Sequence, residues 1–296
     1  MMLDGFQHKI CDLNGVKIAY SEREESKGKA PLLLLHGFPQ NRFMWSRIAP
    51  ILAEHFHVIC ADLRGYGGSS KPKGVAEYSF RKMGQDQLEL MTSLGFDRFH
   101  LIGHDRGART AYRMALDASD RIKSLTVMDI TPTHFLLDAL KSEVARAYYH
   151  WFFLAQPSPF PETLIAADAD YYFESCLLGW GGSTLEQFDQ RALDAYRKTW
   201  RDPATIEAMC NDYRAALDYD FDLDQRDLSR QLDLPALVMW GAGGAMDKSF
   251  DLPETWRARL KRFECSTIAG GHFFPDIHPK DTAAALLCFL KPLSDY

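Results

Sequence analysis

The stretch HLIGHDRGAR, residues 100–109, constrains the fold more tightly than any other part of the sequence. Its apolar first half predicts a buried β-strand, and the residues that follow, RGARTAYRMALD, predict a helix. Asp105 stands between them in a G-x-D-x-G turn, where the flanking Gly103 and Gly107 let the backbone turn tightly. Such a turn raises the central side chain above the end of the strand, at the positive N-terminus of the helix. We therefore expect Asp105 to be an ionised nucleophile.

The segments around this turn alternate between strand and helix signals. Near-continuous apolar strands that alternate with amphipathic helices indicate a mostly parallel sheet covered by helices on both faces, which is an α/β fold. Residues 79–95 and 279–291 are typical of the covering helices. The expected strands occupy residues 16–22, 31–38, 56–65, 99–105, 122–130, 233–242 and 265–272. We expect the last two of these strands to be buried.

The pattern changes after Pro132. Residues 134–232 contain no convincing buried strand, and they are typical of several helices separated by proline and glycine breaks such as PSPFPE and GWGGS. We therefore divide the chain into a core, residues 1–132 and 233–296, and an inserted helical cap, residues 133–232. Such an insertion is expected over the C-terminal edge of the sheet, where open α/β sheets bind their ligands.

Composition excludes several classes of function. With 296 residues, 46% of them apolar and 25% charged, the chain is ordinary for a globular enzyme. The formal charge of −6 gives no general attraction to nucleic acid or to an anionic membrane, so a bound anion needs a local cluster of cations. The six cysteines lack metal-ligand spacing, and neither a signal peptide nor a run of ~18 apolar residues is evident. We expect a cytoplasmic protein with reduced thiols and no metal.

Two other turns that follow strands lie in the same part of the expected sheet. The HGFP turn at residues 36–39 ends a buried strand, and we expect the N–H of Phe38 and that of Arg106 to form an oxyanion hole. The DLRGYGGS turn at residues 62–69 follows the next strand, and we interpret it as structural.

A histidine follows the last expected strand. His272, in the sequence GGHF, stands where the chain order nucleophile, acid, histidine places the general base. Two aspartates compete to orient its imidazole, Asp129 and Asp247, because each ends a strand at the C-terminal edge of the sheet. The sequence pattern alone does not decide between them.

Together these motifs resemble a known family. HGFP, DLRGYGGS, GHDRG and GGH, in that order, resemble the α/β-hydrolase fold. Within that fold, the cluster Asp105-Arg106-x-x-Arg109, YHW at residues 149–151 and NDYRA around Tyr213 closely resemble the fluoroacetate (haloacetate) dehalogenases. The resemblance covers essentially the whole chain. It implies a homodimer that hydrolyses a small haloacid to glycolate and halide without a cofactor.

The resemblance also implies roles for individual residues. It favours Asp129 over Asp247 as the acid that orients His272, because the acid of this family follows the sixth strand, just before the cap. It implies that the side chains of Arg106 and Arg109 bind the substrate carboxylate. The halide pocket of the family is a His-Trp pair and a tyrosine from the cap, which match His150, Trp151 and Tyr213.

These assignments explain why a carboxylate stands at the nucleophile position. A carboxylate can displace a halide from carbon, and the ester that it forms can later be hydrolysed. Asp105 and an anionic substrate would repel each other by several kcal/mol. Arg106 and Arg109, three residues apart at the start of one helix, share a face and offset this repulsion.

Two other functions stay open on the sequence alone. An epoxide hydrolase would use the same Asp105 and His272, with Tyr213 and Tyr149 available to protonate the epoxide oxygen. Against it, a neutral epoxide gives no reason for Arg106 beside the nucleophile. A binding protein without catalytic activity would be expected to lack the nucleophile or the base, and both are present here.

Overall fold

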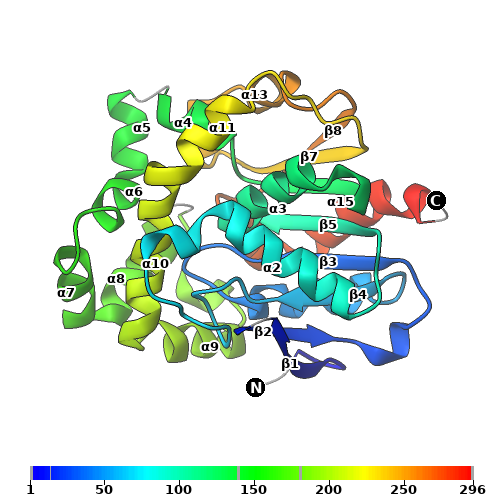
Figure 1. The fold of residues 1–296 in the computed structure, drawn as a ribbon, viewed down its shortest axis with the longest axis horizontal. Helices are drawn as coiled ribbons and strands as arrows, with labels where there is room; N and C mark the ends of the chain where they lie inside the picture. Colours follow the sequence, from blue (N-terminus) through cyan, green and yellow to red (C-terminus); the bar gives the residue numbers. More distant parts are fainter. Residues whose placement is uncertain (1–2, 14, 139–140, 180–181, 295–296) are drawn as a thin grey trace.

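The computed structural model describes residues 3–13, 15–138, 141–179 and 182–294, which form an α/β fold around one sheet (Figure 1). The strand order is β1-β2-β4-β3-β5-β6-β7-β8. β2 is antiparallel to β1 and to β4, and every pairing from β4 across to β8 is parallel. The strands are β1 (Gln7–Leu13), β2 (Val16–Glu22), β3 (Pro31–Leu35), β4 (His57–Ala61), β5 (Phe99–His104), β6 (Ile122–Met128), β7 (Ala236–Ala242) and β8 (Phe263–Ala269).

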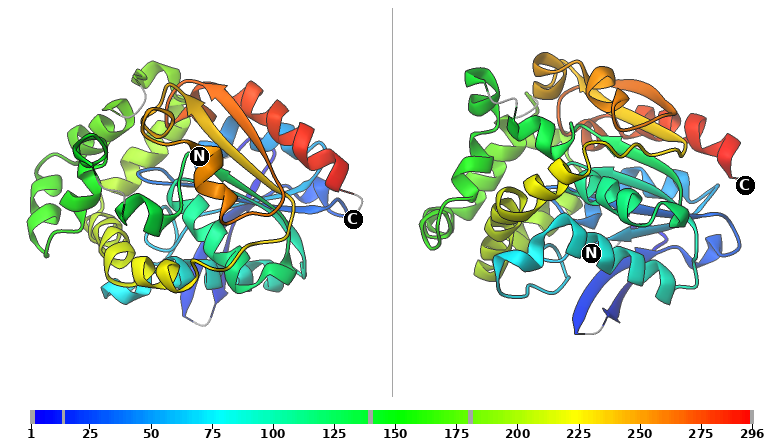
Figure 2. Two further views of the ribbon diagram at one scale, coloured as in Figure 1. Left: turned by 90° about the horizontal axis from the view of Figure 1, so that it is seen from above. Right: turned by 45° about the horizontal axis from the view of Figure 1, so that its top comes forward.

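Helices cover both faces of this sheet. Seen from above, α2 and α3 lie on one face and α15 on the other (Figure 2). All residues of β4 and β5 are buried, which explains why these strands are almost continuously apolar in the sequence. The core helices are α1 (Ala49–Leu52), α2 (Phe80–Ser93), α3 (Arg106–Asp117), α12 (Ala245–Ser249), α13 (Leu252–Arg257), α14 (Phe274–Ile277) and α15 (Pro279–Leu290).

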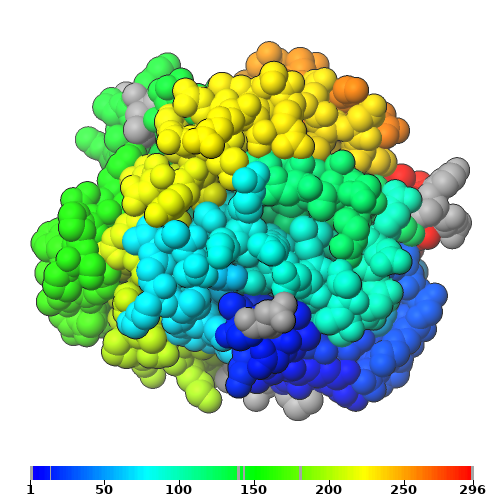
Figure 3. All heavy atoms as spheres, in the orientation of Figure 1, coloured from blue at the N-terminus to red at the C-terminus, as the bar shows by residue number. Residues whose placement is uncertain are grey.

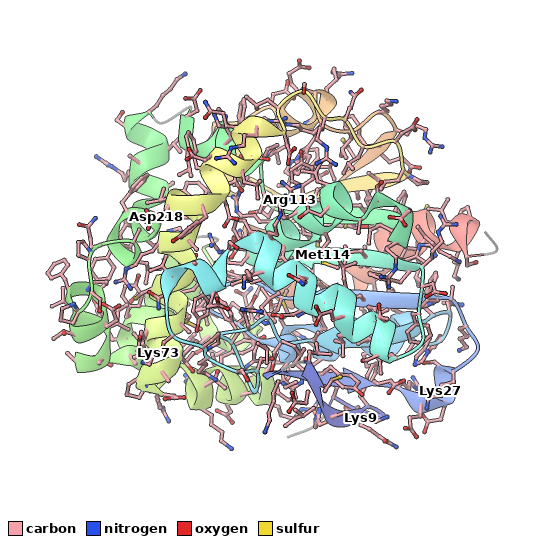
Figure 4. The ribbon with its side chains drawn as sticks, in the orientation of Figure 1. Lys9, Lys27, Lys73, Arg113, Met114 and Asp218 are labelled. Atoms are coloured by element: carbon pink, nitrogen blue, oxygen red, sulfur yellow. The ribbon has the colours of Figure 1, made fainter. Side chains whose placement is uncertain are left out.

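The helices between β6 and β7 gather to one side of the sheet, at the left of Figure 1. Among them, α10 contacts the core segment η3 (Val75–Tyr78) as well as α6, α7 and α9. Lys73, which is labelled in Figure 4, forms an ion pair with Glu207 of α10. The space-filling view shows the yellow atoms of α10 and α11 packed directly against the cyan atoms of the core (Figure 3). These helices are α4 (Thr133–Asp138), α5 (Ser142–Ala147), α6 (Tyr149–Leu154), α7 (Phe160–Ala167), α8 (Ala169–Gly179), α9 (Gln190–Trp200), α10 (Pro203–Ala215), the π-helix η6 (Ala216–Asp220) and α11 (Phe221–Arg226).

Most of the predicted elements are confirmed, and two differences have clear causes. β8 was expected to be buried, but it is an edge strand in which Ile268 alone is buried among Phe263–Ala269. The apolar residues of this segment predict a strand, but they do not reveal that it lies at the edge of the sheet. β1 (Gln7–Leu13) was not predicted, because it contains many polar residues and lacks the apolar pattern of a buried strand. It nevertheless pairs along its whole length with β2.

Smaller expectations also have outcomes. Asp62, in the DLRGYGGS turn, accepts hydrogen bonds from the N–H groups of Arg42 and Gly68, each at 2.8 Å, as expected of a structural turn. All six cysteines are free thiols. Within the described ranges, no helix is both long enough and apolar enough to cross a membrane.

Candidate active site

Asp105 occupies the turn between β5 and α3 in a backbone conformation that side chains rarely adopt, with φ 48° and ψ −117°. The flanking glycines permit this turn. A Cβ at Gly103 would lie 2.3 Å from the carbonyl oxygen of Gly107, and one at Gly107 would lie 2.3 Å from that of His36. Because α3 begins at the next residue, the Asp105 carboxylate lies at the positive end of a helix. Strained residues of this kind cluster at functional sites.

The loop after β3 approaches Asp105 from the side. The N–H of Phe38 donates to Oδ2 of Asp105 at 3.0 Å. This contact requires glycine at position 37, because a Cβ on Gly37 would lie 2.5 Å from the Cβ of Asp105. The N–H of Arg106, the first residue of α3, has no acceptor within its own helix. Of the two N–H groups expected in the oxyanion hole, that of Phe38 therefore contacts the Asp105 carboxylate, and that of Arg106 directly follows Asp105 in the chain.

His272 and Asp129 are brought together across the ends of β8 and β6. Nδ1 of His272 lies 2.6 Å from Oδ2 of Asp129. The other carboxylate oxygen of Asp129 accepts the N–H of Gly241 at 3.1 Å, and Asp129 itself has a positive φ of 55°. A side chain at Gly241 would lie 2.3 Å from the carbonyl oxygen of Gly271. Glycine is therefore required at position 241, at the end of β7, so that the turn containing Gly271 and His272 can pack against this strand.

Asp247, the other candidate acid, bonds elsewhere. Asp247 lies exposed on the short helix α12, and its carboxylate accepts Nε1–H of Trp240 at 2.9 Å and the N–H of Gly243 at 2.8 Å. These contacts close a turn and do not involve the imidazole of His272.

Electrostatics favour an ionised carboxylate at Asp105 and a more basic imidazole at His272. Burial opposes the charged form of His272, but the hydrogen bond and the charge of Asp129 outweigh it, so the pKa of His272 is raised. Burial also opposes ionisation of Asp105, but the positive charges of His272 and of the nearby arginines outweigh it, so the pKa of Asp105 is lowered. His104 donates from Nε2 to the carbonyl oxygen of His272 at 2.8 Å, and burial lowers its pKa to about 4.

Arg106 is fully buried and paired with an acid from the helical insertion. Its Nε donates to Oδ2 of Asp212 at 3.0 Å, and its Nη2 donates to Oδ1 and, at 2.8 Å, to the carbonyl oxygen of the same residue. The hydroxyl of Tyr66 donates to Oδ2 of Asp212 at 2.6 Å. Nη1 of Arg106 is buried and has no hydrogen-bond partner in the described part of the chain.

Arg109 has a different environment. Its Nη1 donates to two uncharged oxygens, the carbonyl of Thr131 at 3.0 Å and the hydroxyl of Thr133 at 3.1 Å. Among the described residues, no carboxylate lies within ion-pair distance of its guanidinium, and its Nε has no hydrogen-bond partner. Burial lowers the pKa of Arg109 to about 10, which still leaves the side chain charged at neutral pH.

The three residues of the expected halide pocket lie together against the arginines. The ring of Tyr213 lies 5.6 Å from that of His150 and 5.4 Å from that of Trp151. Trp151 contacts both guanidiniums, with its ring 4.9 Å from Arg106 and 4.8 Å from Arg109. All three side chains are buried, and the Tyr213 hydroxyl has no hydrogen-bond partner among the described residues.

A small cavity is lined by both Asp105 and His272. Its water-accessible volume is about 20 Å³, which suits a very small ligand. It is lined by Asp105, Asp129, Ala147, Tyr148, His150, Ala245 and His272. An open groove of about 510 Å³ shares Ala147 and Ala245 with this cavity and therefore adjoins it.

Three residues with specific contacts here were not singled out from the sequence. Asp212 and Tyr66 hold the guanidinium of Arg106, and Gly241 bonds Asp129. A charged residue within a mostly buried helix was the available signal for Asp212. Tyr66 belongs to the DLRGYGGS turn, which we interpreted as structural, and Gly241 belongs to β7, where a single glycine has no distinguishing pattern.

Comparison with known proteins places the chain among enzymes. A family model for the alpha/beta hydrolase fold matches residues 30–279. The chain is 52% identical over 294 residues to the fluoroacetate dehalogenase of Burkholderia sp, covering 98% of this chain and 95% of that protein. It is 30% identical over 294 residues to the soluble epoxide hydrolase of Corynebacterium sp. (strain C12), covering 97% and 98%. The crystal structure of a candidate alpha/beta hydrolase from Nostoc sp PCC 7120 matches with a TM-score of 0.94 at 43% identity, covering 98% of this chain and 99% of that one.

Proposed function

The chain belongs to the α/β-hydrolase family and, within it, to the fluoroacetate dehalogenases, and on this premise we propose that it converts haloacetates to glycolate and halide through an ester on Asp105. The observation that carries the proposal is the pair of buried guanidiniums, Arg106 and Arg109, beside an ionised carboxylate nucleophile. An anionic substrate accounts for the charge of Arg109, which has no carboxylate within ion-pair distance among the described residues, and for the unpartnered Nη1 of Arg106, whereas a neutral substrate gives no reason for either.

The first step is a displacement at carbon. Phe38 binds Oδ2 of Asp105, which leaves Oδ1 to attack the carbon that bears the halogen. A C–O bond forms, the C–halogen bond breaks with its electron pair, and the halide leaves on the opposite side. Arg106 and Arg109 bind the substrate carboxylate by charge-assisted hydrogen bonds, which offset the repulsion between the two anions and hold the carbon in line.

The halide leaves towards His150, Trp151 and Tyr213. Burial lowers the pKa of His150 well below its usual value, so its neutral imidazole can donate one N–H. Burial raises the pKa of Tyr213, so its hydroxyl keeps its proton and can donate as well. Each well-placed donor stabilises the transition state by roughly 3 kcal/mol. This stabilisation matters most for fluoride, whose small size concentrates the developing charge.

The second step hydrolyses the ester. His272 takes a proton from water, and the water oxygen attacks the carbonyl carbon of the Asp105 ester. The N–H groups of Phe38 and Arg106 bind the developing oxyanion, and Asp129 stabilises the imidazolium. The bond between the carbonyl carbon and the glycolate oxygen then breaks, and the proton on His272 passes to that oxygen. The second proton of the water is released to solvent, so Asp105 is returned as a carboxylate with one oxygen from water, and no cofactor takes part.

We also propose that residues 133–232 act as a cap on the core formed by residues 1–132 and 233–296. His150, Trp151 and Tyr213 come from this segment and contact residues at the strand ends, as when the ring of Phe38 lies 5.2 Å from that of Tyr213. A cap that supplies the halide pocket would exclude water from the displacement step.

The proposal is tested by product release. We expect fluoride and glycolate from fluoroacetate, chloride and glycolate from chloroacetate, and no turnover of a neutral epoxide such as styrene oxide. Asp105→Asn should abolish release. Under single-turnover conditions in ¹⁸O-labelled water, Asp105 should acquire the label. Turnover of the epoxide alone would overturn the proposal.

One observation favours an epoxide hydrolase as the second candidate. The buried hydroxyl of Tyr213, which lacks a partner among the described residues, could protonate an epoxide oxygen, and one relative at 30% identity is an epoxide hydrolase. This function would not require Arg109, so Arg109→Met would leave epoxide turnover intact while abolishing that of haloacetate.

We further propose a cytoplasmic homodimer. The resemblance to the fluoroacetate dehalogenases supports the dimer, and free exposed thiols at Cys265 and Cys288 suit a reducing compartment. Light scattering during size-exclusion chromatography tests the first expectation, and cell fractionation tests the second.

A further inference from the structure

Arg106 and Arg109 are held so differently that they cannot contribute equally to the site. We infer that Asp212, supported by Tyr66, is a positioning residue that cancels the charge of Arg106 and fixes its direction, so that Arg109 supplies the net positive charge for the substrate carboxylate. This inference rests on the proposed haloacetate dehalogenase activity and assigns separate tasks to the two arginines.

The contacts of Asp212 account for one whole side of the Arg106 guanidinium. Nε and Nη2 donate to the carboxylate, and Nη2 also donates to the backbone carbonyl of the same residue. The planar guanidinium is enclosed by aromatic rings, with that of Tyr213 at 4.3 Å and that of Phe80 at 4.5 Å. A planar fork held at two nitrogens and packed against rings cannot rotate. Nη1 is therefore the buried nitrogen of this guanidinium that has no hydrogen-bond partner among the described residues and that a bound carboxylate would meet.

Asp212 is ionised in this arrangement. Burial raises its pKa, but the carboxylate accepts hydrogen bonds from Nε and Nη2 of Arg106 and from the hydroxyl of Tyr66, and these bonds oppose the effect of burial. The Arg106 guanidinium is a donor only and could not accept a hydrogen bond from a neutral carboxyl group, so its contacts favour the ionised form of Asp212. The ion pair raises the pKa of Arg106, so the charges of Arg106 and Asp212 cancel within a fully buried pair.

Arg109 lacks such a partner. Its contacts with Thr131 and Thr133 are to uncharged oxygens, and among the described residues no carboxylate pairs with its guanidinium, although the nearby charge of Asp105 stabilises the cation. When a haloacetate enters, its carboxylate meets the charge of Arg109 and the directed Nη1 donor of Arg106. A charge attracts the anion from many directions, whereas a fixed donor selects one orientation.

The same helix connects this clamp to the halide pocket. Asp212 and Tyr213 are neighbours on α10, and the first bonds Arg106 while the ring of the second packs on its guanidinium. A shift of α10 would therefore move the halide donor and the carboxylate donor together. This geometry fixes the distance between the donor for the substrate carboxylate and the donor for the leaving halide.

Binding of acetate, a carboxylate that cannot react, tests the division of tasks. Asp212→Asn removes one negative charge and keeps the shape of the side chain. We expect acetate to bind at least about threefold more tightly, because the site gains net positive charge, while kcat for chloroacetate falls at least about tenfold, because Arg106 loses its direction. A residue that merely supported the fold would weaken binding and catalysis together, and that result would overturn the inference.

A charge-balanced comparison provides the second measurement. The double variant Arg106→Met/Asp212→Asn removes both charges of the pair, so we expect acetate binding to weaken only about tenfold, through loss of the Nη1 bond. Arg109→Met removes net charge and should weaken acetate binding at least about 100-fold. Equal losses in the two proteins would contradict the separate roles.

Milder variants and matched controls keep the test decisive if Asp212→Asn folds poorly. Tyr66→Phe removes one hydrogen bond to the carboxylate and should lower kcat about threefold to tenfold, whereas Tyr78→Phe, which loses a bond from a buried hydroxyl to the carbonyl of Pro72, should not. Asp220→Asn is the control for the acid, because burial raises the pKa of Asp220 to about 8 and the group is already uncharged at neutral pH.

If Tyr66→Phe and Tyr78→Phe behave alike, the inference fails. Absence of halide release by the unmodified enzyme would instead refute the proposed function, whatever the acetate measurements show.

Discussion

Nδ1 of His272 lies 2.6 Å from Oδ2 of Asp129, although 143 residues separate them in the chain. The parallel sheet creates this contact, because β6 and β8 present their C-terminal ends at the same edge, with β7 between them. Gly241 at the end of β7 leaves room for the contact and donates its N–H to the second oxygen of Asp129. A histidine bonded to a buried carboxylate is suited to act as a general base in the second step of the proposed reaction.

His272→Asn should separate the two steps. Displacement of halide does not use the imidazole, so the variant should still release about one equivalent of chloride from chloroacetate. Hydrolysis of the ester should slow by about 10²–10⁴-fold, and intact-mass spectrometry should then show a carboxymethyl ester on Asp105. The double variant with Asp105→Asn is the control and should show no adduct. Normal turnover without an adduct would contradict the two-step mechanism.

The hydrolytic step should depend on pH through the raised pKa of His272. The imidazole takes a proton only when it is neutral, so the single-turnover rate of ester hydrolysis should fall as the pH drops below a value above 6.5. Asp129→Asn removes the charge that raises the pKa of His272. The burial of the imidazole remains, and burial lowers this pKa. In that variant the acid limb should move to lower pH, and the maximum rate should fall by about 10²–10⁴-fold. An acid limb at the same pH in both proteins would show that His272 is not the titrating group.

Asp276 should make stability depend on pH in the opposite sense to most carboxylates. Its buried carboxyl group accepts Nε2–H of Gln40 at 2.8 Å, and burial raises its pKa to about 7 from 3.8. The folded state therefore keeps a proton that the unfolded chain releases as the pH rises above about 4. Its contribution to stability is present below pH 4, declines as the pH rises to about 7, and is constant above that.

Asp276→Asn replaces this group by an amide that cannot ionise. The variant should be more stable than the unmodified protein at pH 8, by at most about 4 kcal/mol, and the difference should shrink towards pH 4. Gln40 can turn its amide to accept from the new side chain, because its Oε1 has no other partner among the described residues. Thermal unfolding across this pH range provides the measurement, with Asp281→Asn, at a site exposed by 72%, as the control. A constant difference at all pH values would contradict the assignment.

The site residues that follow strands were predictable from the sequence, because the topology of a parallel sheet brings the C-terminal ends of its strands to one edge. Asp105, Phe38 and His272 each follow a strand, and parallel strands bring such positions to one edge. The choice between Asp129 and Asp247 was not predictable in this way. Both follow neighbouring strands, and the structure distinguishes them by the backbone at Asp129 and by the bonds of Asp247 to its own loop.

The site residues that the helical segment contributes were harder to predict from the sequence. His150 and Tyr213 are 63 residues apart on α6 and α10, and no hydrophobic period predicts that their rings lie 5.6 Å apart. The resemblance to a known family placed them together. Asp212 was not predicted because an acid on a helix is usually solvated, and its burial depends on the position of Arg106 in another part of the chain.

Tyr213→Phe should distinguish between halides. The hydroxyl of Tyr213 is buried without a partner among the described residues, so it is available to a leaving halide. Fluoride carries its charge on a smaller ion than bromide does, and it therefore loses more when one donor is removed. We expect kcat/KM for fluoroacetate to fall by about 10²–10³-fold, the effect of one transition-state donor, and that for bromoacetate by less than about tenfold. Tyr78→Phe, which removes a hydroxyl bonded to the backbone, should change neither value. Equal losses for both substrates would assign Tyr213 to packing and leave His150 and Trp151 to bind the halide.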